Sequence, residues 1–111
     1  MSRRDDATSL RQMLDHAREI VALTRNKSLA DVQNDRMLEL SLLHLLSVVG
    51  EAARRVSPAF RDAHPEIAWR EITATRNWLM HVYDDVNLGT VWRTATEDIP
   101  SLVATLERLV R

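Results

Sequence analysis

The chain has 111 residues, 45% of them hydrophobic and 28% charged, a composition typical of a globular domain rather than a disordered segment. It has no cysteine, which excludes disulfides and thiolate metal sites, and its two glycines are too few for a β fold with many turns. The net charge of −1 excludes a general electrostatic attraction for nucleic acid. We expect a single helical domain over residues 1–111.

The sequence contains no candidate membrane segment. The start of the chain has basic residues, but the apolar stretch of a signal peptide does not follow them. The most apolar run, Leu38 to Val49, is interrupted by Glu39 and His44, and it is too short and too polar to span a bilayer. The sequence therefore predicts a cytoplasmic protein.

Hydrophobic residues follow the helical i, i+3, i+4 spacing from the first part of the chain onward. The first predicted helix runs from about Ala7 to Arg25. Its N-cap is expected at Asp5, Asp6 or Thr8, because short polar side chains satisfy the free backbone N–H groups of a first turn.

The second predicted helix begins after Ser28 or Asp31 and runs to about Val56. Its middle, "LSLLHLLSVVGEAARRV", is apolar on nearly every side, as in a central helix or a helix at an oligomer interface, so His44 is predicted to be a core or interface histidine. Gly50 costs about 0.8–1.0 kcal/mol of helix propensity relative to alanine. A glycine in this position indicates the close approach of another backbone.

The segment "SPAFRDAHPEI" breaks the pattern, and a third helix is expected from Pro65 or Trp69 to about Tyr83. The remaining predicted elements are a polar turn at residues 84–89, a helix at residues 90–98 and a final helix that opens at Pro100. The predicted fold class is all-α, an up-and-down bundle of four to five helices.

The third helix carries the stretch "TRNWLMHVYDD", which contains Arg76, Asn77, His81 and Tyr83. On a helix Asn77 and His81 are an i, i+4 pair, so their side chains can touch. A histidine with a pKa near neutral transfers protons, and an arginine binds a phosphate and stabilises charge on it. These two groups suffice for metal-free RNA cleavage, in which a 2′-OH attacks the adjacent phosphate.

The Arg-x4-His spacing alone is not specific, because "RQMLDH", from Arg11 to His16, has it too. Glu51 has two interpretations: it orients Arg76 or His81 across an interface, or it is a surface carboxylate.

Asp84 and Asp85 follow the histidine and resemble metal ligands, but adjacent aspartates after a helix are more typical of a capping turn. We therefore predict no metal and no other cofactor.

The residues around the motif carry a family resemblance. From Gly50 onward the chain reads "GEAARRVSP…HPEIAWREITATRNWLMHVYDDVNLGTVWRTATEDIPSLVATL". This resembles the HepT-like toxins of the HEPN superfamily, whose typical run is Gly-Glu-Ala, Pro-x-Ile-x-Trp-Arg-x-Ile, Arg-Asn, His-x-Tyr, and a Trp before a closing Pro-x-Leu. The segment "RQMLDH" lacks the Asn after its Arg and the Tyr two residues after its His. Val82 departs from the glycine that the family commonly has between His and Tyr.

The resemblance implies a role for each matching residue. Arg76 and His81 would form the ribonuclease centre where two protomers of a homodimer meet, and Asn77 would be their polar companion. Tyr83 is similar to the tyrosine that a cognate nucleotidyltransferase antitoxin modifies with AMP. Nucleotide phosphates added there would fill the cleft with negative charge and block RNA.

Two functions follow as hypotheses. The first is a metal-independent endoribonuclease toxin of a type VII-like toxin–antitoxin pair, neutralised by AMP transfer to Tyr83. The alternative is a non-catalytic helical binding partner of a nucleotidyltransferase, in which Arg76 and His81 contact nucleotide.

Overall fold

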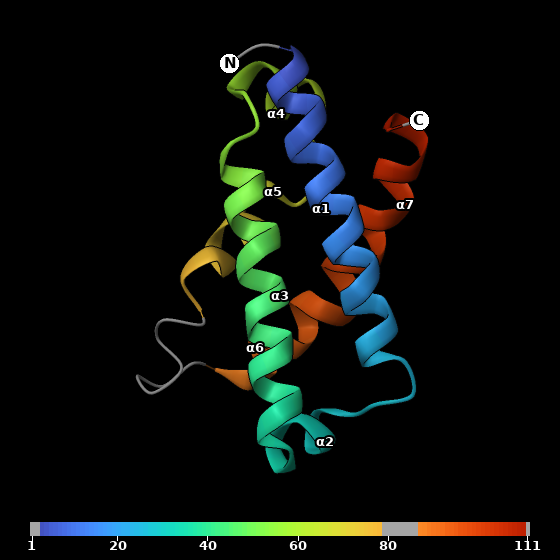
Figure 1. The fold of residues 1–111 in the computed structure, drawn as a ribbon, viewed down its shortest axis with the longest axis vertical. Helices are drawn as coiled ribbons and strands as arrows, with labels where there is room; N and C mark the ends of the chain where they lie inside the picture. The colour runs from blue at the N-terminus through green and yellow to red at the C-terminus, as the bar shows by residue number, and fades with distance from the viewer. Residues whose placement is uncertain (1–2, 79–86, 111) are drawn as a thin grey trace.

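The computed structural model describes residues 3–78 and 87–110, and every regular element in these ranges is a helix. The all-α prediction is confirmed. Three long helices form the body of the bundle: α1 (Arg3–Thr24), α3 (Arg36–Arg54) and α7 (Ile99–Leu109). Helix α1 packs against both α3 and α7 (Figure 1). Within the described ranges, no helix has the combination of length and hydropathy needed to cross a bilayer.

Shorter elements complete the bundle. Helix α5 and the 3₁₀ turn η1 pack against α3, whereas the π-helical turn η3 contacts α7 and α1. The short elements are α2 (Leu29–Asn34), α4 (Pro58–Ala63), α5 (Trp69–Ala74), η1 (Thr75–Asn77), α6 (Leu88–Arg93) and η3 (Thr94–Asp98).

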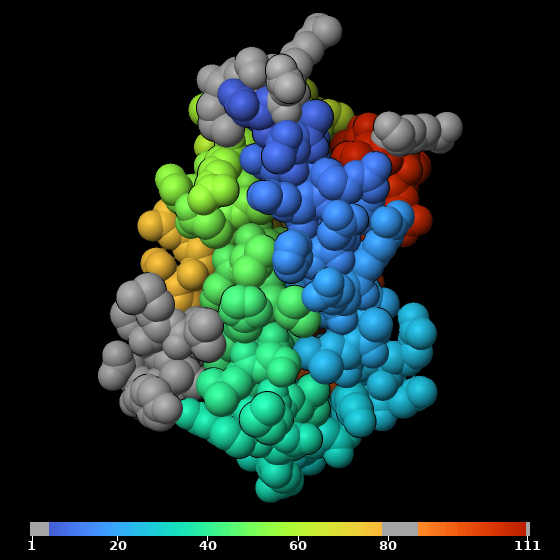
Figure 2. Space-filling model, viewed as in Figure 1, coloured from blue at the N-terminus to red at the C-terminus, as the bar shows by residue number. Residues whose placement is uncertain are grey.

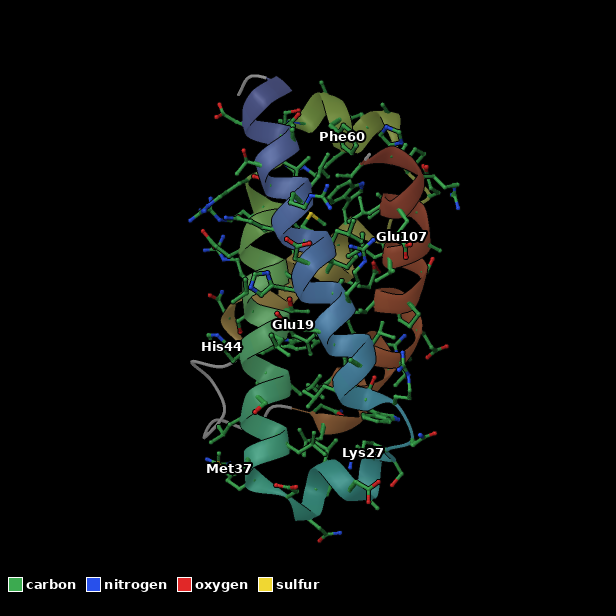
Figure 3. All side chains as sticks on the ribbon, turned by 45° about the vertical axis from the view of Figure 1, so that its right-hand side comes forward. Glu19, Lys27, Met37, His44, Phe60 and Glu107 are labelled. Atoms are coloured by element: carbon green, nitrogen blue, oxygen red, sulfur yellow. The ribbon has the colours of Figure 1, made fainter. Side chains whose placement is uncertain are left out.

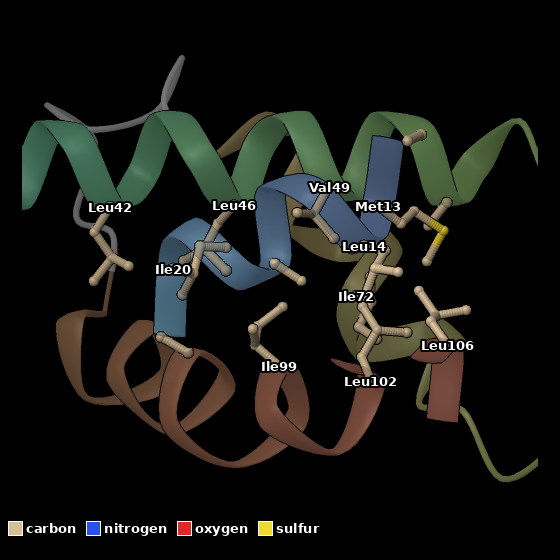
Figure 4. Close-up of a cluster of buried hydrophobic side chains, with 14 of the residues drawn as sticks. Met13, Leu14, Ile20, Leu42, Leu46, Val49, Ile72, Ile99, Leu102 and Leu106 are labelled. Atoms are coloured by element: carbon tan, nitrogen blue, oxygen red, sulfur yellow. The ribbon is translucent and has the colours of Figure 1, made fainter. Parts of the chain in front are cut away.

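The core lies between α1, α3, α5 and α7, where fully buried aliphatic side chains interdigitate (Figure 4). Burial of one such side chain stabilises the fold by about 1.5–3 kcal/mol. The cluster includes Met13, Leu14, Ile20, Leu42, Leu46, Val49, Ile72, Ile99, Leu102 and Leu106. The apolar stripe of α3 is thus core within one chain.

His44 was predicted to be a core or interface histidine. It lies on the exposed side of α3 (Figure 3), so the core interpretation is wrong, and the interface interpretation stays a prediction.

The start of α1 differs from the sequence-based expectation. The helix begins at Arg3, so Asp5 and Asp6 lie in its first turn, where the helix dipole favours negative charge. The carboxylate of Asp6 accepts hydrogen bonds from the backbone N–H (2.9 Å) and the hydroxyl (2.6 Å) of Ser57. Ser57 is itself the N-cap of α4. Asp6 therefore joins the start of α1 to the start of α4 instead of capping its own helix.

The second predicted helix is two helices. Ser28 caps α2, and it forms a capping box with Asp31, which agrees with the predicted start. Asp35 has an extended backbone and ends α2, and its side chain then accepts a hydrogen bond from the Leu38 N–H at the start of α3 (3.1 Å). The break arises because Asp35 caps a new helix better than it continues the old one.

The third predicted helix begins at Trp69, one of its two expected starts, but its α-helical part ends at Ala74. It continues as the 3₁₀ turn η1, so the prediction of regular α-helix through Arg76 is wrong. The Thr75 carbonyl accepts the local bond of this turn from the Trp78 N–H (3.1 Å), and it also accepts a tertiary hydrogen bond from the Ser47 hydroxyl on α3 (3.2 Å).

The C-terminal part was predicted more closely. Asn87 caps α6, so residues 88 and 89, expected in the polar turn, are helical. Pro100 lies in the first turn of α7, as predicted.

At Gly50 the backbone of α3 and that of the segment from Ile72 to Arg76 come very close together. A Cβ atom on Gly50 would lie 2.5 Å from the backbone nitrogen of Arg76 and 2.9 Å from the Ile72 carbonyl oxygen, closer than real Cβ atoms come. No side chain fits there without movement of backbone. The predicted close approach is confirmed, and the backbone that uses it is the segment that carries Arg76.

We predict that Gly50→Ala lowers the free energy of unfolding by about 1–3 kcal/mol, because overpacking against backbone outweighs the gain in helix propensity. Urea denaturation followed by circular dichroism measures the change. Gly89→Ala is the matched control, because its Cβ meets only the side-chain oxygen of Asn87, at 3.1 Å. Equal stability changes for the two variants would contradict the prediction.

Candidate functional site

The candidate site is built on the contact between α3 and η1. The Thr75 hydroxyl is fully buried and lies within hydrogen-bond distance of the carbonyl oxygens of Leu46, on α3, and Ile72, one turn earlier. The Thr75 carbonyl also accepts a hydrogen bond from the Ser47 hydroxyl, so the side-chain hydroxyl and the backbone carbonyl of Thr75 are both hydrogen-bonded. The residue that immediately precedes Arg76 is therefore locked in place.

Arg76 and Asn77 follow this anchor, and both side chains are exposed. The structure thus presents a guanidinium and an amide to solvent from a backbone that is held firmly against α3. Such an arrangement suits an anion site, because the donors are ordered at their base and accessible at their tips.

Glu51 lies one residue after the glycine, on α3. Its carboxylate is bound by both nitrogens of an arginine fork: Arg54 Nη2 lies 2.8 Å from Oε1, and Arg54 Nε lies 3.3 Å from Oε2. The Nε atom of Arg55 lies 3.5 Å from the same Oε1. Both arginines follow Glu51 at helical spacing, i+3 and i+4.

The pKa of the Glu51 carboxyl is lowered, chiefly by the hydrogen bond from Arg54, and further by the charges of Arg54, Arg55 and Arg76. Partial desolvation opposes these effects. Of these charges, that of Arg76 contributes least to the lowering.

The predicted site residues have different outcomes in the structure. Arg76 and Asn77 are adjacent in η1, and the backbone of Arg76 lies against Gly50, the residue before Glu51. His81 and Tyr83 lie outside the described residues, so their roles stay predictions. Arg54 and Arg55 were missed by sequence reasoning, although their spacing from Glu51 in "GEAARR" is that of helical ion pairs.

A metal centre is not evident in the described part of the chain. Among residues 3–78 and 87–110, no group of three histidine, aspartate or glutamate side chains is arranged to hold an ion. Asp84 and Asp85 lie outside these ranges, so the capping interpretation of this pair also stays a prediction.

Comparison with known proteins adds the decisive observation. The profile of the family described as Ribonuclease HepT-like matches residues 13–109, which include every candidate residue above. The chain belongs to the HepT-like ribonuclease family. The resemblance seen in the motifs is thereby confirmed, and the chain is a ribonuclease of the HEPN type.

Curated relatives cover almost the whole chain. "Probable ribonuclease HepT" of Thermococcus cleftensis is 36% identical over 81% of this chain and 82% of its own length. "Putative RNase MJ1380" of Methanocaldococcus jannaschii is 28% identical over 96% of this chain and 98% of its own length. No solved structure matches the chain at a significant level.

We predict that the pKa of Glu51 lies below its ordinary value and rises most in Arg54→Ala, because Arg54 supplies the largest stabilisation of the carboxylate. Arg55→Ala and Arg76→Ala should produce smaller rises. NMR titration of the Glu51 carboxyl carbon measures all three.

Because the pKa of Glu51 is lower in the folded than in the unfolded protein, its ionised carboxylate stabilises the fold at pH values above the unfolded pKa. This contribution to stability is lost as the pH falls through the folded pKa. An unchanged Glu51 pKa in Arg54→Ala would contradict the arrangement.

Proposed function

We propose that the chain is a metal-independent endoribonuclease toxin of a type VII-like toxin–antitoxin pair, active as a homodimer. The observation that carries the proposal is the exposed Arg76–Asn77 pair, set on a turn whose preceding residue is fixed to α3 by buried hydrogen bonds. Membership of a ribonuclease family supports RNA as the substrate.

In the proposed reaction the 2′-oxygen of one nucleotide attacks the adjacent phosphorus, and the bond from phosphorus to the 5′-oxygen breaks. The products are a 2′,3′-cyclic phosphate and a 5′-hydroxyl. Arg76 binds the scissile phosphate and stabilises the charge that accumulates on its oxygens. Asn77 positions the RNA or His81.

The reaction needs two proton transfers: a base takes the proton of the 2′-OH, and an acid supplies one to the leaving 5′-oxygen. One chain contributes one His81, five residues after Arg76 in the sequence. A homodimer that faces two copies of the motif would supply two histidines, one in each role, and would double the local density of arginine. The need for two proton-transfer groups supports the dimeric arrangement.

Tyr83 is the proposed regulatory residue. A cognate nucleotidyltransferase would transfer AMP to its hydroxyl, forming a phosphodiester and releasing pyrophosphate from ATP. Because Tyr83 lies only two residues beyond His81 in the sequence, the added phosphates would compete with RNA for Arg76.

We predict that the purified protein cleaves single-stranded RNA in EDTA, and that Arg76→Ala and His81→Ala each lower kcat at least about 100-fold, the usual scale for loss of a proton-transfer or charge-stabilising group. Gel analysis of defined RNA with a terminal cyclic-phosphate assay measures both rate and product. Arg25→Ala and His64→Ala are matched controls outside the motif and should retain activity.

Identical trace cleavage by wild type and both motif variants would exclude the ribonuclease proposal for this site. The non-catalytic partner of a nucleotidyltransferase would then be favoured. A protein that sediments as a monomer at micromolar concentration yet cleaves at full rate would contradict the composite cleft.

We predict that co-expression with its cognate nucleotidyltransferase adds one or more AMP units to the wild-type chain and none to Tyr83→Phe, because the phenol oxygen is the acceptor. Intact-mass spectrometry reads the additions directly. Persistence of the AMP mass in Tyr83→Phe would place the acceptor on another residue.

A further inference from the structure

A groove of about 340 Å³ runs between α1 and α3, on the face where the two helices lie side by side (Figure 2). Its size is within the range of pockets that hold small molecules, about 300–1,000 Å³. Residues that line it include Gln12, His16, His44, Val48, Glu51 and Arg55. The roles described above for Arg76 and its neighbours do not use the two histidines or Gln12.

The groove has apolar and polar lining residues. The half-buried Val48 and the buried Ala52 are the apolar part, here called the floor, and the polar residues, here called the rim, include His16 from α1 and His44 from α3. The Nδ1 atom of His16 lies 2.8 Å from the Gln12 carbonyl oxygen. Since a carbonyl only accepts, Nδ1 carries the proton, and Nε2 of the neutral ring is an acceptor. The ring of His16 is thus held in a defined orientation.

The groove adjoins the candidate site through Ser47. This residue lines the groove, and its hydroxyl donates a hydrogen bond to the carbonyl of Thr75, the residue before Arg76 (3.2 Å). Arg55 also lines the groove, and its Nε atom lies 3.5 Å from a carboxylate oxygen of Glu51. A polyanion that meets Arg76 therefore has a second guanidinium and an apolar surface nearby.

We propose that this groove is a nucleobase-binding subsite for the RNA substrate, holding a base away from the scissile phosphate; this rests on the proposed ribonuclease function. Histidine rings stack unpaired bases, and an apolar floor favours a flat heterocycle. The His16 Nε2 acceptor and the Gln12 amide meet the edge of the base, and Arg55 binds the phosphate attached to that nucleotide.

The chemistry of the rim favours RNA over a second copy of the chain as the occupant. The centre of a protein interface is depleted of charged groups, whereas Glu51, Arg55 and two histidines surround this floor. Stacking surfaces beside guanidiniums are instead typical of single-stranded nucleic acid sites.

The test measures the affinity of the full chain for a short fluorescein-labelled single-stranded RNA by anisotropy. The 2′-hydroxyls of this RNA are O-methylated, so that the proposed reaction cannot cleave it during the measurement. Val48→Phe fills the groove and His16→Ala removes a stacking ring. We expect each to weaken binding about tenfold, the scale of one lost base contact. In cleavage assays both should raise KM and leave kcat nearly unchanged, unlike Arg76→Ala.

Leu109→Phe is the matched control for added bulk, since Leu109 is an exposed residue on α7, and His64→Ala is the control for a lost imidazole. Both should bind RNA as the wild type does, and thermal unfolding verifies that every variant folds. With RNA that carries 4-thiouridine, photocrosslinks should map to peptides of α1 and α3 in the wild type and decrease in Val48→Phe.

The outcomes separate the two proposals. Arg76-dependent cleavage with unchanged affinity in Val48→Phe and His16→Ala would overturn the subsite alone. A wild-type chain that neither binds nor cleaves RNA would overturn both. A groove variant that loses RNA affinity only together with a shift in sedimentation would assign the groove to a second copy and would also overturn the subsite.

Discussion

The structure depends on the absence of a side chain at Gly50. At Gly50 the backbone of α3 lies against the Ile72–Arg76 segment, and one turn earlier on α3 the Leu46 carbonyl lies within hydrogen-bond distance of the Thr75 hydroxyl. An unpaired hydroxyl at this buried position would cost free energy. The hydrogen bonds of Thr75 therefore fix the position of the segment. The hydrophobic core and the candidate site meet at this contact between α3 and the Ile72–Arg76 segment.

The same contact between α3 and the Ile72–Arg76 segment also restricts the backbone from which the exposed Arg76 side chain extends. An arginine on a surface helix usually explores many rotamers, and fixing it costs conformational entropy. Here the preceding residue is buried and hydrogen-bonded, and Arg76 itself lies in the 3₁₀ turn, so part of that cost is met when the chain folds. Glu51 then adds an electrostatic constraint from the neighbouring helix. Preorganisation of this kind is what a phosphate-binding group requires.

The sequence was sufficient for those features that a local pattern encodes. Helical periodicity predicted α1, the body of α3 and the start of α7, and a glycine in mid-helix predicted a close backbone approach. Tertiary effects were not predictable from it. The 3₁₀ turn at Arg76 accepts a hydrogen bond from Ser47, which is distant in sequence, and Asp6 bonds Ser57 rather than its own helix.

The prediction that His44 lies in the core is wrong for a related reason. The surrounding sequence is apolar on nearly every side of the helix, and such a segment does not reveal which side faces solvent. For the candidate site, the motif predicted Arg76 and Asn77. It did not predict Arg54 and Arg55, because these two matter through the Glu51 carboxylate that they share.

That shared carboxylate has a consequence for ionic strength. Glu51 is a built-in counterion for the guanidiniums of Arg54, Arg55 and Arg76, so three positive charges and one negative charge leave the patch at +2. RNA binding to arginines releases condensed cations from the phosphates, and affinity falls with salt in proportion to the phosphates neutralised. Glu51 already neutralises part of the positive charge of the three arginines. The affinity for RNA bound at these residues would therefore depend less steeply on salt than the number of arginines alone suggests. Salt that screens the RNA also loosens the exposed pairs of Glu51 and thereby frees arginine, which further flattens the response.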